Sequence, residues 1–151
     1  SPAKATTTFF TGCGKGFADI VSIIVSASVF AMGLRAAGLV DVMIEGLKSS
    51  NEYAQWGGVL GPYLMAILVG SGDAATMAFN EAVTPHAESF GMSITNLGNL
   101  AYVSGALGRT MSPIAGVVIV IAGLCRSNPL DLVKRTAPGM IVGVLTLLFV
   151  F

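Results

Sequence analysis

Two short segments of the sequence combine glycine, an ionisable residue and small hydroxyl side chains. The first is Gly70-Ser71-Gly72-Asp73, and the second covers residues 108–113 and contains Arg109. A guanidinium can bind a carboxylate through two hydrogen bonds, and backbone N–H groups at a helix start also favour anions. The segments therefore predict an anion site, and the candidate substrate-binding residues are Gly70, Ser71, Gly72, Asp73, Thr76, Arg109, Thr110 and Ser112.

Asp73 and Glu81 are carboxylates that fall inside otherwise apolar segments, and Asn80 lies beside Glu81. Ionisable residues within membrane segments are typical of ion and proton pathways. These three residues are therefore candidates for ion coupling, and either H⁺ or Na⁺ fits them. No other cofactor is expected. Cys13 and Cys125 have neither the number nor the spacing of a metal site or a disulfide framework, so no metal is expected either.

The composition indicates that these residues are carried by a membrane protein. Of 151 residues, 54% are hydrophobic and 11% are charged, whereas soluble domains have about 25% charged residues. The mean hydropathy is +0.79. Eight basic residues balance eight acidic ones, which gives no basic excess for nucleic-acid binding. Nineteen glycines and six prolines interrupt the apolar stretches instead of lying between them.

We expect an all-α integral membrane protein, because crossing the hydrocarbon requires about 20 apolar helical residues and several stretches approach that length. The predicted order is a scaffold-type transmembrane helix with an external loop, a re-entrant helical hairpin, a broken transmembrane helix, and a cytoplasmic loop with a last transmembrane helix. These segments cover residues 1–52, 53–88, 89–125 and 126–151, respectively. Within the hairpin, Gly57-Gly58 and Gly61-Pro62 mark the predicted start of the first helix. The last helix is predicted from Thr136.

A helix can be broken at membrane depth only where protein or a polar cavity satisfies the exposed backbone groups. Two breaks therefore predict a polar cavity, with half-helices starting at Ala74 and near Ser112 or Pro113. Other interpretations are compatible with the same residues. The glycines could serve helix packing, Arg109 could pair with Asp73 or Glu81 or extend to the headgroups, and Ser and Thr side chains could bond their own helices.

The positive-inside rule gives an orientation for these segments. If the first span, residues 20–34, runs outward and the hairpin returns to its own side, five cations are cytoplasmic and two are external. The carboxyl end is then outside. The cytoplasmic cations are Lys4, Lys15, Arg126, Lys134 and Arg135, and the external ones are Arg35 and Lys48.

Three strings, which begin at Gly70, Gly105 and Lys134, resemble the C-terminal half of DcuC-type C4-dicarboxylate transporters. They are GSGDAATMAFNEAVTP, GALGRTMSPIAGV and KRTAPGM. The resemblance implies one half of an inverted-repeat transporter of the ion transporter superfamily, with the N-terminal half of the same protein as a partner and homodimers as an assembly. It also implies exchange or proton-coupled efflux of small dicarboxylates across the bacterial inner membrane. Better-known members of the superfamily have Ser-Asn-Thr at the hairpin tip; their sodium site is not carried over to Ser71-Gly72-Asp73.

Two other function classes fit parts of the sequence. Residues 70–73 match the GxGD pattern of intramembrane aspartyl proteases, which need a second aspartate to share one proton. The other aspartates lie near predicted membrane edges and do not follow a tyrosine, as that partner usually does. A non-transporting membrane subunit, in which small residues only allow close helix packing, is the third possibility.

Overall fold

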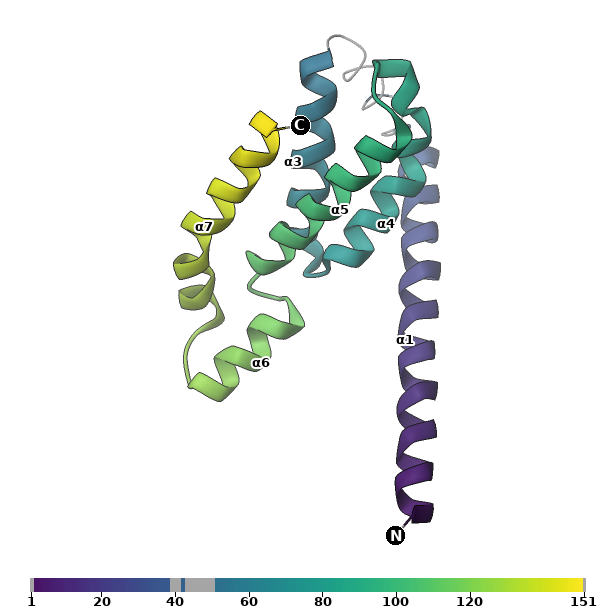
Figure 1. Ribbon diagram of the computed structural model, residues 1–151, viewed down its shortest axis with the longest axis vertical. Helices are drawn as coiled ribbons and strands as arrows, with labels where there is room; N and C mark the ends of the chain where they lie inside the picture. Colours follow the sequence, from purple (N-terminus) through teal and green to yellow (C-terminus); the bar gives the residue numbers. More distant parts are fainter. Residues whose placement is uncertain (1, 39–41, 43–50, 151) are drawn as a thin grey trace.

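The computed structural model describes residues 2–38, 42 and 51–150, and within these ranges all regular structure is helical. Seven elements follow one another along the described chain (Figure 1). They are α1 (Pro2–Ala36), α3 (Asn51–Val69), α4 (Gly72–Ala82), the 3₁₀ helix η1 (Thr84–Phe90), α5 (Ile94–Thr110), α6 (Gly116–Cys125) and α7 (Pro129–Val150). The all-helical expectation is confirmed for the described residues.

Helices α3, α4 and α5 form the centre of the molecule, and α7 packs along the side of α3 and α5 (Figure 1). Their shared core consists of Val59, Tyr63, Leu100, Val144 and Leu148. Helix α1 runs alongside α4 at the opposite edge. At 1.5 Å per residue, the 35 residues of α1 extend over about 52 Å, which is longer than the hydrocarbon is thick.

Small residues allow the central helices to approach closely. A Cβ atom built on Gly105 would lie against the Thr76 hydroxyl and 3.0 Å from the Gly72 carbonyl oxygen. A Cβ on Gly108 would lie 2.9 Å from the Ala66 Cβ. Close contacts between small residues are the usual way in which membrane helices associate. The hairpin formed by α3 and α4 is therefore held tightly against α5.

Two helices begin earlier than the sequence indicates. Helix α3 starts at Asn51 and continues through Gly61 and Pro62, because tertiary packing outweighs their low helix propensity; Pro62 is fully buried. Helix α7 starts at Pro129, where the Asn128 side chain accepts a hydrogen bond from the Leu130 N–H at 2.9 Å. Proline in a first turn with such a cap is a favourable helix start.

Among the described helices, α7 is both long enough and apolar enough to cross a membrane. Only 11% of its most apolar stretch is buried. Two shorter apolar helical stretches are Gln55–Val69 and Gly116–Cys125. The first span predicted from the sequence, residues 20–34, lies within α1. Most of the predicted external loop lies outside the described residues.

Candidate anion-binding site at the hairpin tip and the helix break

The turn between α3 and α4 forms the tip of the helical hairpin. Gly70 has φ 76°, a left-handed conformation that glycine adopts without steric cost. Ser71 is extended, and its Oγ accepts a hydrogen bond from the Ala74 N–H at 3.2 Å. This N-cap starts α4 at Gly72, and it places Asp73 in the first turn, where a negative charge is favoured.

The second interruption separates α5 from α6. After α5 ends at Thr110, a turn forms in which Ser112 N–H donates to the Arg109 carbonyl at 3.1 Å and Ala115 N–H donates to the Ser112 carbonyl at 3.2 Å. Helix α6 therefore begins at Gly116, later than the predicted start near Ser112 or Pro113. Its N-cap, Ala115, has no side chain that can bond the first N–H groups, so these groups can donate hydrogen bonds to an anion.

The tip and the break lie against each other, although the sequence separates them by about 40 residues. A Cβ atom on Gly70 would lie 3.0 Å from the Ile114 Cγ1 and 3.1 Å from the Ile114 carbonyl oxygen. Across the same contact, Arg109 Nη1 is 3.6 Å from Asp73 Oδ2. The two charged side chains are 45% and 60% exposed, so this ion pair adds little to stability. The pair remains accessible to a ligand.

The candidate hydroxyl groups differ in their hydrogen bonding. Thr76 Oγ1 donates to the Ala101 carbonyl at 3.2 Å, and Thr110 Oγ1 donates to the Ala106 carbonyl of its own helix at 3.1 Å. Ser112 is fully buried, and its Oγ has no hydrogen-bond partner within the described part of the chain. A buried hydroxyl without a partner is costly, so Ser112 is the hydroxyl with most to gain from a ligand.

The structure places two of the ion-coupling candidates away from the tip. Asn80 and Glu81 lie about two helical turns beyond Asp73, at a rise of about 10 Å along α4. Asn80 Oδ1 accepts a hydrogen bond from Thr84 Oγ1 at 2.8 Å, next to the start of η1. Asp73 is thus the ion-coupling candidate that lies beside Arg109.

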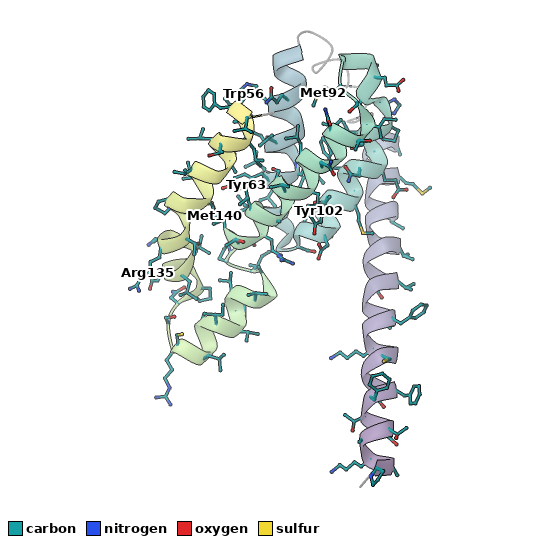
Figure 2. All side chains as sticks on the ribbon, in the orientation of Figure 1. Trp56, Tyr63, Met92, Tyr102, Arg135 and Met140 are labelled. Carbon is teal, nitrogen blue, oxygen red and sulfur yellow. The ribbon has the colours of Figure 1, made fainter. Side chains whose placement is uncertain are left out.

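Two residues that sequence reasoning missed hold α5, which ends at the break, against α3. The Tyr63 hydroxyl of α3 contacts Met111 Sδ at the end of α5, and Tyr63 lies in the middle of the bundle (Figure 2). Ser104 Oγ donates to the Val59 carbonyl, also on α3. Ser104 and Gly108 form a small-xxx-small pair, a pattern that could have indicated this helix contact from sequence. No local pattern distinguishes Tyr63.

An apolar helical chain, whose two interruptions meet around an accessible arginine, has the architecture of a membrane protein with a polar site between its helices. The chain belongs to the DcuC family of C4-dicarboxylate anaerobic carriers, whose family description matches residues 2–151. This membership confirms the resemblance inferred from the sequence strings. It also identifies the chain as part of a transporter family and not of an enzyme family.

Several curated relatives are similar to this chain. An uncharacterized transporter of Haemophilus influenzae is 55% identical over 97% of this chain and 53% of its own length. The anaerobic C4-dicarboxylate transporters DcuC of Escherichia coli K12 and of Shigella flexneri are each 34% identical over 89% of this chain and 30% of their own length. The chain thus spans about half the length of the Haemophilus relative, and it spans a smaller share of the two DcuC relatives. No solved structure matches it.

Proposed function

We propose that the protein carries out secondary active transport of C4-dicarboxylates such as succinate, fumarate and malate across the bacterial inner membrane. Transport proceeds by exchange or by proton-coupled efflux. The observation that carries this proposal is the contact between the hairpin tip and the helix break, which brings Arg109 to within 3.6 Å of a carboxylate. Relatives named C4-dicarboxylate transporters support the substrate class. No specific observation favours the protease or the non-transporting subunit.

Arg109 provides the fixed positive charge of the site. A planar guanidinium can bind a carboxylate through two parallel N–H···O bonds. The uncapped start of α6 and the start of α4 add partial positive charge on either side. In this arrangement, one substrate carboxylate binds Arg109, and the Ser112 hydroxyl becomes available when the contact between Gly70 and Ile114 opens.

The other carboxylate of the substrate needs further polar groups. We assign these to the N-terminal half of the same transporter, which would form an inverted repeat with this chain in a multi-pass protein. The family resemblance further implies that this protein assembles as a homodimer. The roughly half-exposed Arg109 side chain supports this assignment, because the described residues leave it open to a facing surface. The chain's share of its relatives' length leaves room for such a half.

Asp73 would link transport to an ion. Its carboxylate occupies the side of Arg109 that a substrate carboxylate would occupy. Because two carboxylates at one guanidinium repel each other, substrate binding favours neutralisation of Asp73 by H⁺ or by Na⁺. Either ion would make dicarboxylate binding and ion uptake interdependent.

The test is uptake of labelled succinate or fumarate by proteoliposomes. These contain the complete protein in their membrane and unlabelled dicarboxylate in their interior. We expect Arg109→Ala to lower dicarboxylate affinity by about 10- to 150-fold, which corresponds to the loss of about 1.5–3 kcal/mol from a charged hydrogen bond. Arg126→Asn is the matched control: it also removes an arginine, and asparagine tolerates the left-handed φ of 50° at this position.

Unchanged dicarboxylate affinity in Arg109→Ala would show that the binding-site assignment is wrong. If the complete wild-type protein exchanges no dicarboxylate, the transport proposal itself fails and the non-transporting subunit becomes the better interpretation. If peptide cleavage were detected and then lost in Asp73→Asn, the result would instead support the protease.

A further inference from the structure

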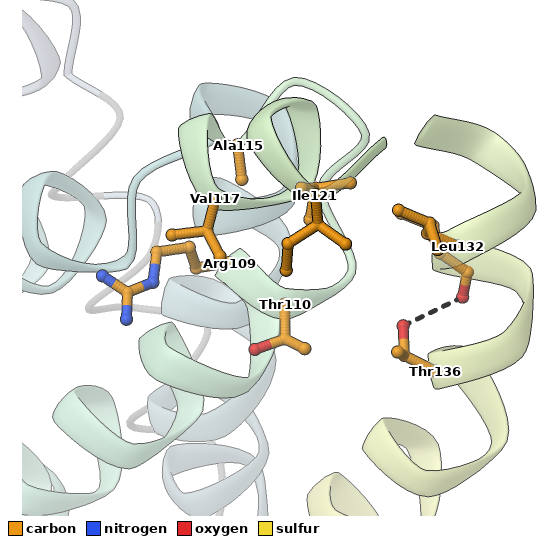
Figure 3. A pocket seen from close by; sticks show the side chains of 9 residues that line it. Arg109, Thr110, Ala115, Val117, Ile121, Leu132 and Thr136 are labelled. Carbon is orange, nitrogen blue, oxygen red and sulfur yellow. Dashed lines mark hydrogen bonds between the residues drawn. The ribbon is translucent and has the colours of Figure 1, made fainter. Parts of the chain in front are cut away.

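A groove runs between α6 and α7, on the side of the break away from the Arg109 guanidinium. Its inner part is an apolar pocket of about 240 Å³. Figure 3 shows Ile121 of α6 facing Leu132 and Thr136 of α7, whereas Val117 lies beside the Arg109 side chain and the Arg109 guanidinium points away from α7. The Thr136 hydroxyl donates to the Val133 carbonyl at 3.1 Å, so it presents little polarity to the pocket. The inner groove therefore suits an apolar chain and not a dicarboxylate.

The same groove opens into a larger pocket of about 500 Å³ at the connection between α6 and α7. Leu132 lines both pockets. The outer pocket is more polar than the inner one and is lined by Cys125, Ser127, Asp131, Leu132, Lys134 and Arg135. Lys134 and Arg135 outnumber the single carboxylate of Asp131, so this end of the groove carries a net positive charge.

Leu132 joins the two parts of the groove, because it lines both pockets. Ile121 and Cys125 are four residues apart on α6, and Leu132 and Arg135 are three apart on α7, so each pair lies on one helix face. On α6, Cys125 of the outer pocket lies one turn nearer to the helix connection than Ile121 of the inner groove. On α7, which runs back from the connection, Leu132 lines both pockets and Arg135 lies one turn beyond it. Figure 2 shows Arg135 at the lower end of α7, directed away from the bundle. A ligand in this groove would have a charged end at the helix connection and an apolar end beside the break.

We propose that this groove binds an anionic phospholipid. The phosphate lies at Lys134 and Arg135 with the Ser127 hydroxyl as a further donor, and an acyl chain lies along Leu132 and Ile121. Basic pockets between membrane helices on the cytoplasmic side are suited to anionic headgroups. The charge complementarity and the adjoining apolar groove together favour a lipid over a free anion. Because α7 is largely unburied, a bilayer lipid can reach the groove from the side.

The location gives the lipid a role. Its acyl chain would contact Val118 of α6 and the aliphatic part of Arg109, both of which line the inner pocket. A bound chain would thus support the break from the side opposite the Asp73 contact. The lipid proposal does not depend on which substrate the protein transports. A protein that binds no lipid could still exchange dicarboxylates, and a protein that exchanges no dicarboxylate could still bind the lipid.

The experiment measures lipid retention by native mass spectrometry of the complete protein, purified in detergent with phosphatidylglycerol or phosphatidylcholine added. Wild type is expected to retain phosphatidylglycerol and to lose phosphatidylcholine. Lys134→Gln combined with Arg135→Gln should weaken phosphatidylglycerol retention by about tenfold or more, since each cation near an anionic headgroup contributes severalfold. Lys4→Gln combined with Lys15→Gln removes two cations of α1 as the control and should retain the lipid. The double variant Lys134→Arg with Arg135→Lys, which keeps both positive charges, should also retain the lipid.

A second pair of variants tests the acyl chain without changing any charge. Ile121→Trp fills the inner groove and should reduce phosphatidylglycerol retention, whereas Ile119→Trp, on an exposed face of α6 that does not line the groove, should not. Equal retention in the charge variant and its control would overturn the proposal. Displacement of the lipid by millimolar glycerol phosphate would also overturn it, because the site would then recognise a soluble phosphate.

Discussion

Arg109 and Asp73 face each other across the contact between two separate interruptions, and both side chains remain accessible. An exposed pair of this kind contributes about 0–1 kcal/mol to stability, and each charge also lies where a helix dipole favours it, with Asp73 in the first turn of α4 and Arg109 in the last turn of α5. The proposed function gives the two charges a second role. In that proposal, the arginine supplies the binding charge, and the aspartate competes with the substrate for it.

This competition predicts the behaviour of Asp73→Asn. Removing the carboxylate while keeping the shape should raise dicarboxylate affinity severalfold, because the substrate no longer competes for Arg109. It should also abolish the dependence of uptake on an ion gradient, while exchange continues. Binding isotherms and counterflow with and without a gradient measure the two effects. Glu88→Gln, which removes an exposed carboxylate of η1, is the control. Lower affinity together with intact coupling would contradict this role for Asp73.

Gly70 offers a second prediction at the residue scale. Gly70→Ala combines a strained left-handed φ of 76° with a contact against Ile114. Gly38 has φ 71° and no atom within 4 Å of a built Cβ, so Gly38→Ala carries the strain without the contact. Each substitution should cost about 1 kcal/mol from strain, and Gly70→Ala should cost about 1–3 kcal/mol more. Thermal unfolding of the purified protein measures the difference, and equal melting temperatures would show that the tip does not press on the break.

At the scale of elements, the contact between α4 and α5 determines how firmly the hairpin is held. Gly105→Ala should destabilise the protein by about 1–3 kcal/mol, because the new methyl group would overlap the Thr76 hydroxyl and crowd the Gly72 carbonyl. Gly123→Ala in α6 places a methyl group in open space and should be neutral or stabilising by up to about 1 kcal/mol. The melting temperature of Gly105→Ala should therefore fall, whereas that of Gly123→Ala should stay the same or rise. A shift of the same sign and size would contradict the close contact.

The elements also show what a single sequence can reveal. Glycine and proline at residues 70–72 and 108–113 correctly indicated both interruptions, because few other residues end helices so strongly. The helix starts were less accurate. Gly61-Pro62 looks like a helix boundary, but a buried Pro62 inside α3 is stabilised by packing that sequence does not report. The contact between Gly70 and Ile114 joins distant segments, and the Tyr63 contact with Met111 has no local signal.

At the scale of the whole molecule, the arrangement of the helices is compatible with the orientation derived from charge. The first half of α1 and the connection between α6 and α7 lie toward one end of the molecule, whereas the start of α3 and the end of α7 lie toward the other (Figure 1). Lys4, Lys15, Arg126, Lys134 and Arg135 belong to the first end. The positive-inside rule places that end in the cytoplasm.

The two native cysteines allow this orientation to be tested directly. Cys13 lies in the first half of α1, Cys125 ends α6, and both are unpaired and exposed. A membrane-impermeant maleimide should therefore leave both thiols unmodified in intact spheroplasts and label both in inverted membrane vesicles, because the charge rule predicts that both lie at the cytoplasmic end. The variants Cys13→Ser and Cys125→Ser assign the labelled positions by mass spectrometry.

Val150→Cys in a background without the native cysteines provides the opposite expectation. Val150 is the last residue of α7 and is 69% exposed, at the end that the charge rule places outside, so its thiol should react in spheroplasts and be protected in inverted vesicles. Labelling of Cys13 and Cys125 from opposite sides would rule out the arrangement of an outward first span, a hairpin that returns to its own side and a broken span. Labelling of both from outside would keep that arrangement but reverse it, and would place the Lys134 and Arg135 groove in the outer leaflet.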